Sequence, residues 1–265
     1  MAINGYNVLN IPSYALNNEI SRTNQSMTSG SQINQSADNA SGQAIVTALS
    51  TQISTQDIAG RNTLDGMSLL QTADGASATI AERLQRMTEL TVQALNGTMS
   101  VSQRSMLDQE FQQNLAGINE VAQNTSFNQQ NLLNGSTGSI DIAMGDTSTS
   151  LNLPDLTTNG LGLSGLSIDN PANASTVLDG LSSAMESLSL TRSGFGAQQQ
   201  GLMTSYNNLQ TQNESAQAAR SRINDTNMAQ ASTDQARQNM LLDARITMQA
   251  QSNQQQASVL QLLNS

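Results

Sequence analysis

The side chains of this sequence that could do chemistry are carboxylates and guanidinium groups. The 265 residues contain neither Cys nor His, and all ten basic residues are Arg, so Lys is absent as well. The common nucleophile–base pairs and the preferred ligands of zinc are therefore missing. Two carboxylates could form an acid–base pair in a shaped pocket, but the Asp and Glu residues are scattered singly from Glu19 to Asp243. The sequence therefore argues against an enzyme, and we expect no cofactor and no bound metal.

The net charge and the apolar content exclude further classes of partner. A charge of −10 at pH 7 repels nucleic-acid phosphates, and no apolar run approaches the roughly 20 residues of a membrane span. No basic amphipathic face suggests binding to a membrane surface. The first residues, MAINGYNVLN, lack the basic and apolar regions of a secretory signal. We expect no nucleic-acid partner, no membrane partner and no cleaved signal peptide.

The elements that would position the polar side chains are long helices with narrow apolar stripes. Ala, Ser, Thr, Asn and Gln dominate the composition, which suits helices packed along a seam better than a thick globular core. Asn170 and Pro171 are a favourable N-cap and first residue of a helix, and apolar residues then recur at alternating steps of four and three. One column of this heptad pattern, which we name the rod seam, contains Leu181, Leu188, Phe195, Leu202 and Leu209.

The remaining segments predict further helices and one hairpin. Apolar spacing indicates helices at about 14–30, from about 40 to 94 with a slip in register near Gly60–Gly66, at about 102–123 and at about 227–263. In the stretch SIDIAMGDTSTSLNL, apolar residues alternate around a Gly-Asp turn, which predicts a small β-hairpin within about 135–170. The predicted fold is mainly α: an elongated antiparallel α-helical coiled-coil bundle with a small β-hairpin insert.

The stretch LQRMTELTVQALNG predicts a helix with one buried and one exposed side. Leu84, Met87 and Ala94 recur at helical spacing and are expected to face the core. The residues expected on the other, exposed side are Arg86, Glu89, Leu90 and Gln93. Glu110 on the following antiparallel helix can approach this exposed side.

Seven stretches of the chain, in this order, resemble bacterial flagellin. They are SGSQINQSADNASGQAI (29–45), LDGMSLLQTADGA (64–76), LQRMTELTVQA (84–94), TSFNQQNLL (125–133), RSGFGAQQQGL (192–202), AARSRINDTNMA (218–229) and QQQASVLQLL (254–263). The chain departs from the family at Gln32 and Ala37, where basic residues are usual, and at Gln129, where Gly is common. The family's large outer region is nearly missing, which implies a smooth, thin filament.

The resemblance implies a structural subunit that self-assembles into the helical flagellar filament for bacterial motility. A hook–filament junction protein of the flagellum is the alternative. The implied domains are an inner coiled-coil core domain from residues 1–42 and 226–265 and an outer rod-like domain from residues 43–225. The apolar residues assigned to the inner assembly core are Leu16, Ile20, Met27, Leu241, Met248, Val259 and Leu262.

The resemblance also implies partners and a location. The first partner is the chain itself, in a helical homopolymer, with other flagellins as an additional possibility in the same filament. The others are a flagellar export chaperone, the type III export apparatus, and hook-associated and cap proteins. The location is the extracellular filament, reached without a cleaved signal peptide. In flagellins the surface matching Arg86, Leu90 and Glu110 binds toll-like receptor 5. Packing between subunits is the alternative role of that surface. The Ser/Thr segments 135–139 and 145–150 are expected to be plain loops. O-linked sugar on them is the alternative, which rests on surface exposure and family habit and not on a motif.

Overall fold

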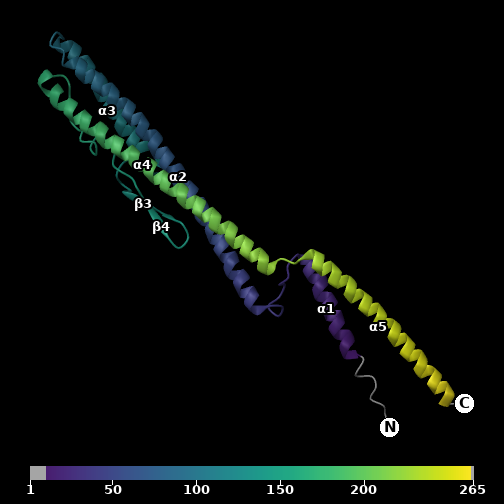
Figure 1. Ribbon diagram of the computed structural model, residues 1–265. Helices are drawn as coiled ribbons and strands as arrows, with labels where there is room; N and C mark the ends of the chain where they lie inside the picture. The colour runs from purple at the N-terminus through teal and green to yellow at the C-terminus, as the bar shows by residue number, and fades with distance from the viewer. Residues whose placement is uncertain (1–9, 264–265) are drawn as a thin grey trace. The chain divides into compact units, whose positions relative to one another are not determined.

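The structure is a computed structural model that describes the backbone of residues 10–263 and the side chains of 14–255, 257 and 258 (Figure 1). The elements in chain order are α1 (Asn10–Ser29), α2 (Ala40–Ala94), α3 (Val101–Asn124), β1 (Ser126–Phe127), β2 (Gln130–Asn131), β3 (Ser139–Ala143), β4 (Ser148–Asn152), α4 (Pro171–Asn224) and α5 (Met228–Leu263). This order confirms the predicted mainly α-helical coiled-coil fold with a small β-hairpin insert.

The chain forms two compact units. One unit contains Met1–Ile53 and Glu214–Ser265, and the other contains Ser54–Asn213. Helices α2 and α4 therefore contribute residues to both units. The resemblance places the domain borders after residues 42 and 225, close to the start of α2 and the end of α4, whereas the two units divide within these helices. The expected domain borders stay a prediction.

In the larger unit, α2, α3 and α4 enclose one hydrophobic core (Figure 1). Residue 56 of α2 lies beside residue 212 of α4, and Asp74 lies beside Arg192, so α2 and α4 run antiparallel. Four residues of the rod seam, Leu181, Leu188, Phe195 and Leu202, are buried in this core, whereas Leu209 is only partly buried.

The residues at the ends of these helices explain where the helices begin. Asn170 caps α4 with its side-chain oxygen, which accepts a hydrogen bond from the amide of Ala172 over 3.0 Å, so α4 begins at Pro171 as predicted. Ser100 and Gln103 form a capping box at the start of α3.

The β-hairpin lies against α2 and α4. Strands β3 and β4 pair antiparallel, with Ile140 opposite Leu151. The Asn62 side chain on α2 donates to the Ala143 carbonyl over 3.0 Å, and Gln198 on α4 accepts from the Asn152 amide over 3.1 Å. A Cβ atom on Gly66 of α2 would stand 3.0 Å from the Ile142 side chain, so glycine at this position lets the hairpin approach the helix closely.

In the smaller unit, two connecting segments hold α1 and α5 together. Ser31 and Asp225 form an isolated antiparallel bridge, and the Thr226 amide donates to the Gly30 carbonyl over 2.9 Å. Asp38 closes the link before α2 by accepting from the amides of Asn34 and Gln35. Burial raises the pKa of the Asp38 carboxyl, but these hydrogen bonds and Arg22 together bring its pKa below the usual value.

Candidate assembly and interaction surfaces

The first candidate surface lies on α1 and α5, which pair with each other in the smaller unit. The side chains of Asn24 and Gln235 are hydrogen-bonded, and the Thr226 hydroxyl donates to the Ser26 carbonyl over 3.2 Å. The C-terminal end of α1 therefore lies beside the N-terminal end of α5, and the two helices run antiparallel.

The predicted assembly-core residues of α1 are more buried than those of α5. On α1, Leu16 is buried, and Ile20 and Met27 are partly buried. On α5, Leu241 is 47% exposed and Met248 is 71% exposed. The side chains of Val259 and Leu262 lie outside the described ones. Pairing within one chain thus covers the apolar residues of α1 more fully than those of α5.

The spacing of residues along α5 explains the difference. The described residues of α5 that are partly buried are Ala231, Asp234, Gln235, Gln238, Leu242 and Ser252, and Ala231, Gln235, Gln238 and Leu242 among them follow steps of four, three and four. Leu242 is the one large apolar side chain among these partly buried residues, and several other large apolar side chains of α5 are exposed. Among the described side chains of α5, the exposed large apolar ones are Met228, Met240, Leu241, Ile246 and Met248. These exposed side chains are the candidates on α5 for contact with another subunit.

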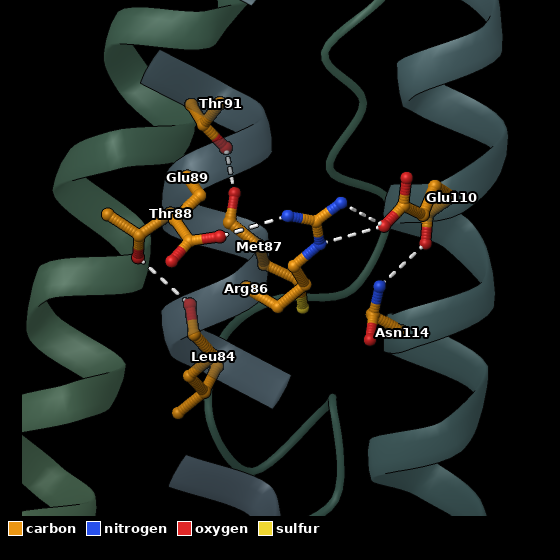
Figure 2. A network of polar contacts seen from close by, with 8 residues as sticks. All are labelled: Leu84, Arg86, Met87, Thr88, Glu89, Thr91, Glu110 and Asn114. Atoms are coloured by element: carbon orange, nitrogen blue, oxygen red, sulfur yellow. Dashed lines mark hydrogen bonds and ion pairs between the residues drawn. The ribbon is translucent and has the colours of Figure 1, made fainter. Parts of the chain in front are cut away.

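The second candidate surface is an ionic network that joins α2 to α3 (Figure 2). Nε and Nη2 of Arg86 lie 2.8 and 2.7 Å from Oε1 of Glu110, and Nη1 lies 3.0 Å from Oε2 of Glu89. The amide of Asn114 donates to the Glu110 carbonyl one turn further along α3. The side chains of Arg86 and Glu110 are 50% and 42% exposed, so the network lies at the surface.

Both carboxylates keep the Arg86 guanidinium charged. The side-chain hydrogen bond to Glu110, then the one to Glu89, and then the electrostatic attraction of these groups raise the pKa of Arg86 above its usual value. These contacts hold the planar Arg86 guanidinium in place between α2 and α3. A guanidinium fixed in this way at the surface is suited to recognising polar groups of a binding partner.

The expected exposure of Leu90 is wrong. Leu90 is 1% exposed and belongs to the hydrophobic core, together with Leu84, Met87 and Ala94. The reason is that α2 packs against both α3 and α4, so the buried stripe is wider than a helix with one neighbour needs. Thr91 is buried on the same stripe, with its hydroxyl bonded to the Met87 carbonyl over 2.7 Å.

Two polar contacts between α2 and α4 were not predicted. Arg192 donates to Asp74 over 2.8 Å, and Asn213 donates to Asp57 over 2.7 Å. Asn213 is buried, as is Gln56 beside it. The apolar spacing of the rod seam does not reveal which polar side chains pair across α2 and α4.

The described residues form neither a membrane span nor a cluster of metal ligands. Within residues 10–263, no helix has a stretch both long and apolar enough to cross a bilayer. Among the described side chains, no three carboxylates gather where they could hold a metal ion.

Comparisons with known proteins agree with a helical subunit of this kind. Residues 11–137 match the family model of the bacterial flagellin N-terminal helical region, and residues 178–263 match that of the C-terminal helical region. The flagellin of Halalkalibacterium halodurans is 37% identical over 93% of this chain and 92% of its own length. A crystal structure of Bacillus cereus flagellin aligns with a TM-score of 0.51 at 34% identity, covering 56% of this chain and 88% of that one.

The chain therefore belongs to the bacterial flagellin family. It is a structural subunit of the flagellar filament, which serves motility. A putative flagellar hook-associated protein from Vibrio parahaemolyticus aligns with a TM-score of 0.61, but at 12% identity that likeness shows the fold alone. Nothing in these comparisons favours the junction protein.

Proposed function

We propose that subunits of the filament join through the apolar side chains that α5 exposes. The carrying observation is that Met240, Leu241, Ile246 and Met248 are exposed while α5 is paired with α1. Burial of exposed apolar surface is the dominant favourable term in most protein association. With α1 they form the inner assembly core, as the resemblance implies for residues 1–42 and 226–265.

The physical reason for polymerisation is an asymmetric contact. When a patch on one subunit meets a different patch on the next, the contact leaves the same patch free again and propagates as a helix. Helix α5 has this property, because it contacts α1 on one side and exposes apolar side chains on the others.

Export and location follow from the same role. We infer that the chain leaves the cell through the flagellar type III export apparatus with a chaperone on its C-terminal helix, and that the filament it joins contacts hook-associated and cap proteins. The absence of Cys supports this route, because no disulfide has to be reduced or formed on the way. The protein would then act outside the cell as a structural subunit and not as an enzyme.

A second role for the Arg86 surface is recognition of a monomer by toll-like receptor 5. The exposed ion pair of Arg86 with Glu110 supports this proposal, whereas the buried Leu90 would act only by keeping α2 in place. Contact between subunits remains the other use of the same surface.

The test of the assembly proposal is a double variant, Leu241→Gln with Met248→Gln. Both side chains are exposed in one chain, so the helicity and unfolding temperature of the monomer should stay close to wild type. Filament growth on added seeds should be lost. The matched control, Leu241→Met with Met248→Leu, keeps both positions apolar and should polymerise. Normal growth of the Gln variant would exclude these residues from the assembly core.

A further inference from the structure

The cationic side chains of this chain are all guanidinium groups. Imidazole, thiol and ammonium groups ordinarily change charge near about pH 6.5, 8.5 and 10.4, whereas a guanidinium stays charged beyond about pH 12. The chain has no His, no Cys and no Lys. Its positive charges therefore persist in alkaline solution, where a chain that uses Lys loses them.

The net charge differs between the two units, so the use of Arg in place of Lys affects them differently. Residues 54–213 carry fourteen carboxylates and five Arg, a net charge of −9, whereas the remaining residues carry six carboxylates and five Arg, a net charge of −1. The unit that contains α1 and α5 is thus nearly neutral. If its five cations were Lys, their deprotonation would change its net charge from −1 to −6, and neighbouring subunits would repel each other more strongly.

Ion pairs between elements depend on the same groups. Arg86 joins α2 to α3 through Glu110, with Glu89 on its own helix, and Arg192 joins α4 to α2 through Asp74 (Figure 2 for the first pair). In the smaller unit, Arg22 approaches Asp38 at 3.9 Å, and Arg237 pairs with Asp234. Every one of these pairs uses a guanidinium.

The direction of the pH effect follows from the pKa values. The hydrogen bonds to Glu110 and Glu89 raise the pKa of Arg86, and the hydrogen bond to Asp74 raises the pKa of Arg192. A basic group whose pKa is higher in the folded than in the unfolded protein stabilises the folded state at every pH below its pKa in the unfolded protein. This stability is lost as the pH rises through its pKa in the folded protein. For Arg that loss begins above about pH 12, and for Lys in the same place above about pH 10.4.

We propose that this subunit is adapted to fold and polymerise in strongly alkaline solution, at about pH 11. The arginine-only set of cations keeps the inter-helix ion pairs formed at that pH and retains all five side-chain positive charges of the α1/α5 unit, which Lys would lose. The polymerisation half of this inference rests on the assembly role proposed for that unit, and the folding half does not.

The folding half is tested on the monomer with the variant Arg86→Lys, Arg192→Lys. Thermal unfolding followed by circular dichroism should give unfolding temperatures within a few degrees of each other for variant and wild type at about pH 7. At about pH 11 the variant should unfold at a distinctly lower temperature than wild type. All other residues are identical in the two proteins, so their response to pH is common to both and cancels in the comparison. Equal unfolding temperatures at the alkaline pH would overturn the role of these guanidinium groups.

The polymerisation half is tested with Lys at the five arginines of the smaller unit, which are Arg22, Arg220, Arg222, Arg237 and Arg245. Seeded growth of this variant at about pH 7 is its own control, because Lys is fully charged there. At about pH 11 its critical concentration should rise at least about tenfold, while that of wild type should change by less than about threefold. A parallel rise in both proteins, or in neither, would overturn the inference. If neither grows at pH 7, the proposed assembly role fails, and the monomer comparison alone decides the remaining half.

Discussion

At the scale of single residues, neighbours in sequence have different roles according to which helix they meet. Arg86 and Leu90 lie about one helical turn apart on α2. Arg86 reaches Glu110 at the surface, whereas Leu90 is enclosed between α3 and α4. The periodicity of the stretch could not assign Leu90, because both sides of a narrow stripe are compatible with the same spacing. The number of helices that surround α2 decides the width of the buried face.

This difference leads to a prediction for receptor recognition. Arg86→Ala should leave the monomer folded and lower its signal in a toll-like receptor 5 reporter assay, since the half-exposed guanidinium and its ion pairs are lost. Leu90→Ala should destabilise the larger unit by about 2–5 kcal/mol, because the side chain is fully buried. The matched control is Arg192→Ala, which removes another partly exposed, ion-paired arginine, on α4. A wild-type signal from Arg86→Ala would remove the receptor role from this surface.

The turn between β1 and β2 contains a second residue-scale effect. Asn128 and Gln129 both adopt positive φ, 48° and 66°, as the central residues of a two-residue hairpin turn. Such turns favour Asn followed by Gly, and Gly is the residue that flagellins commonly have where this chain has Gln129.

The variant Gln129→Gly should therefore be more stable than wild type. A non-glycine residue in the left-handed region costs about 1–2 kcal/mol, and glycine relieves that strain while losing part of the gain to its greater freedom in the unfolded chain. We expect a net gain of up to about 1 kcal/mol in the free energy of unfolding, measured with denaturant. Gln130→Gly, at the next position in β2, is the control and should not stabilise the protein.

At the scale of elements, the pattern of apolar residues predicted most of the architecture. The start of α4 at Pro171 and the antiparallel β3–β4 hairpin follow directly from local sequence. The short β1–β2 hairpin was not predicted, because strands of two residues carry too little alternation to be recognised. The pairing of Asp57 with Asn213 was also missed, because α2 and α4 are far apart in the chain and polar residues do not reveal their partners by spacing.

The rod seam supports a prediction at this scale. Leu202 is 1% exposed, and Leu209 is only partly buried two heptad steps from Phe195. Leu202→Ala should destabilise the larger unit by about 2–5 kcal/mol because it leaves a cavity. Leu209→Ala should cost clearly less, because solvent already reaches that side chain. Chemical denaturation of the two variants measures the difference, and equal losses would mean that the seam is buried evenly along α4.

At the scale of the whole molecule, the two units differ in how complete they are. The unit of residues 54–213 encloses a continuous core from three helices, the hairpin and the segment that follows it. The other unit pairs α1 with α5 through few apolar side chains and leaves others on α5 exposed. Such a unit buries little apolar surface to offset the ordering of its chain. Assembly would supply the missing burial, which is why the incomplete unit is the one we assign to contacts between subunits.

The most direct measurement of this assignment is amide hydrogen exchange on the same protein as monomer and as filament. In the monomer, amides of α1 and α5 should exchange fast and those of 70–120 and 177–202 slowly, because local stability follows buried apolar contact. In the filament, exchange over 228–258 should slow by at least about a hundredfold, as the exposed side chains of α5 become buried. Filaments in which α5 exchanges as fast as in the monomer, with new protection confined to 54–213, would contradict the account.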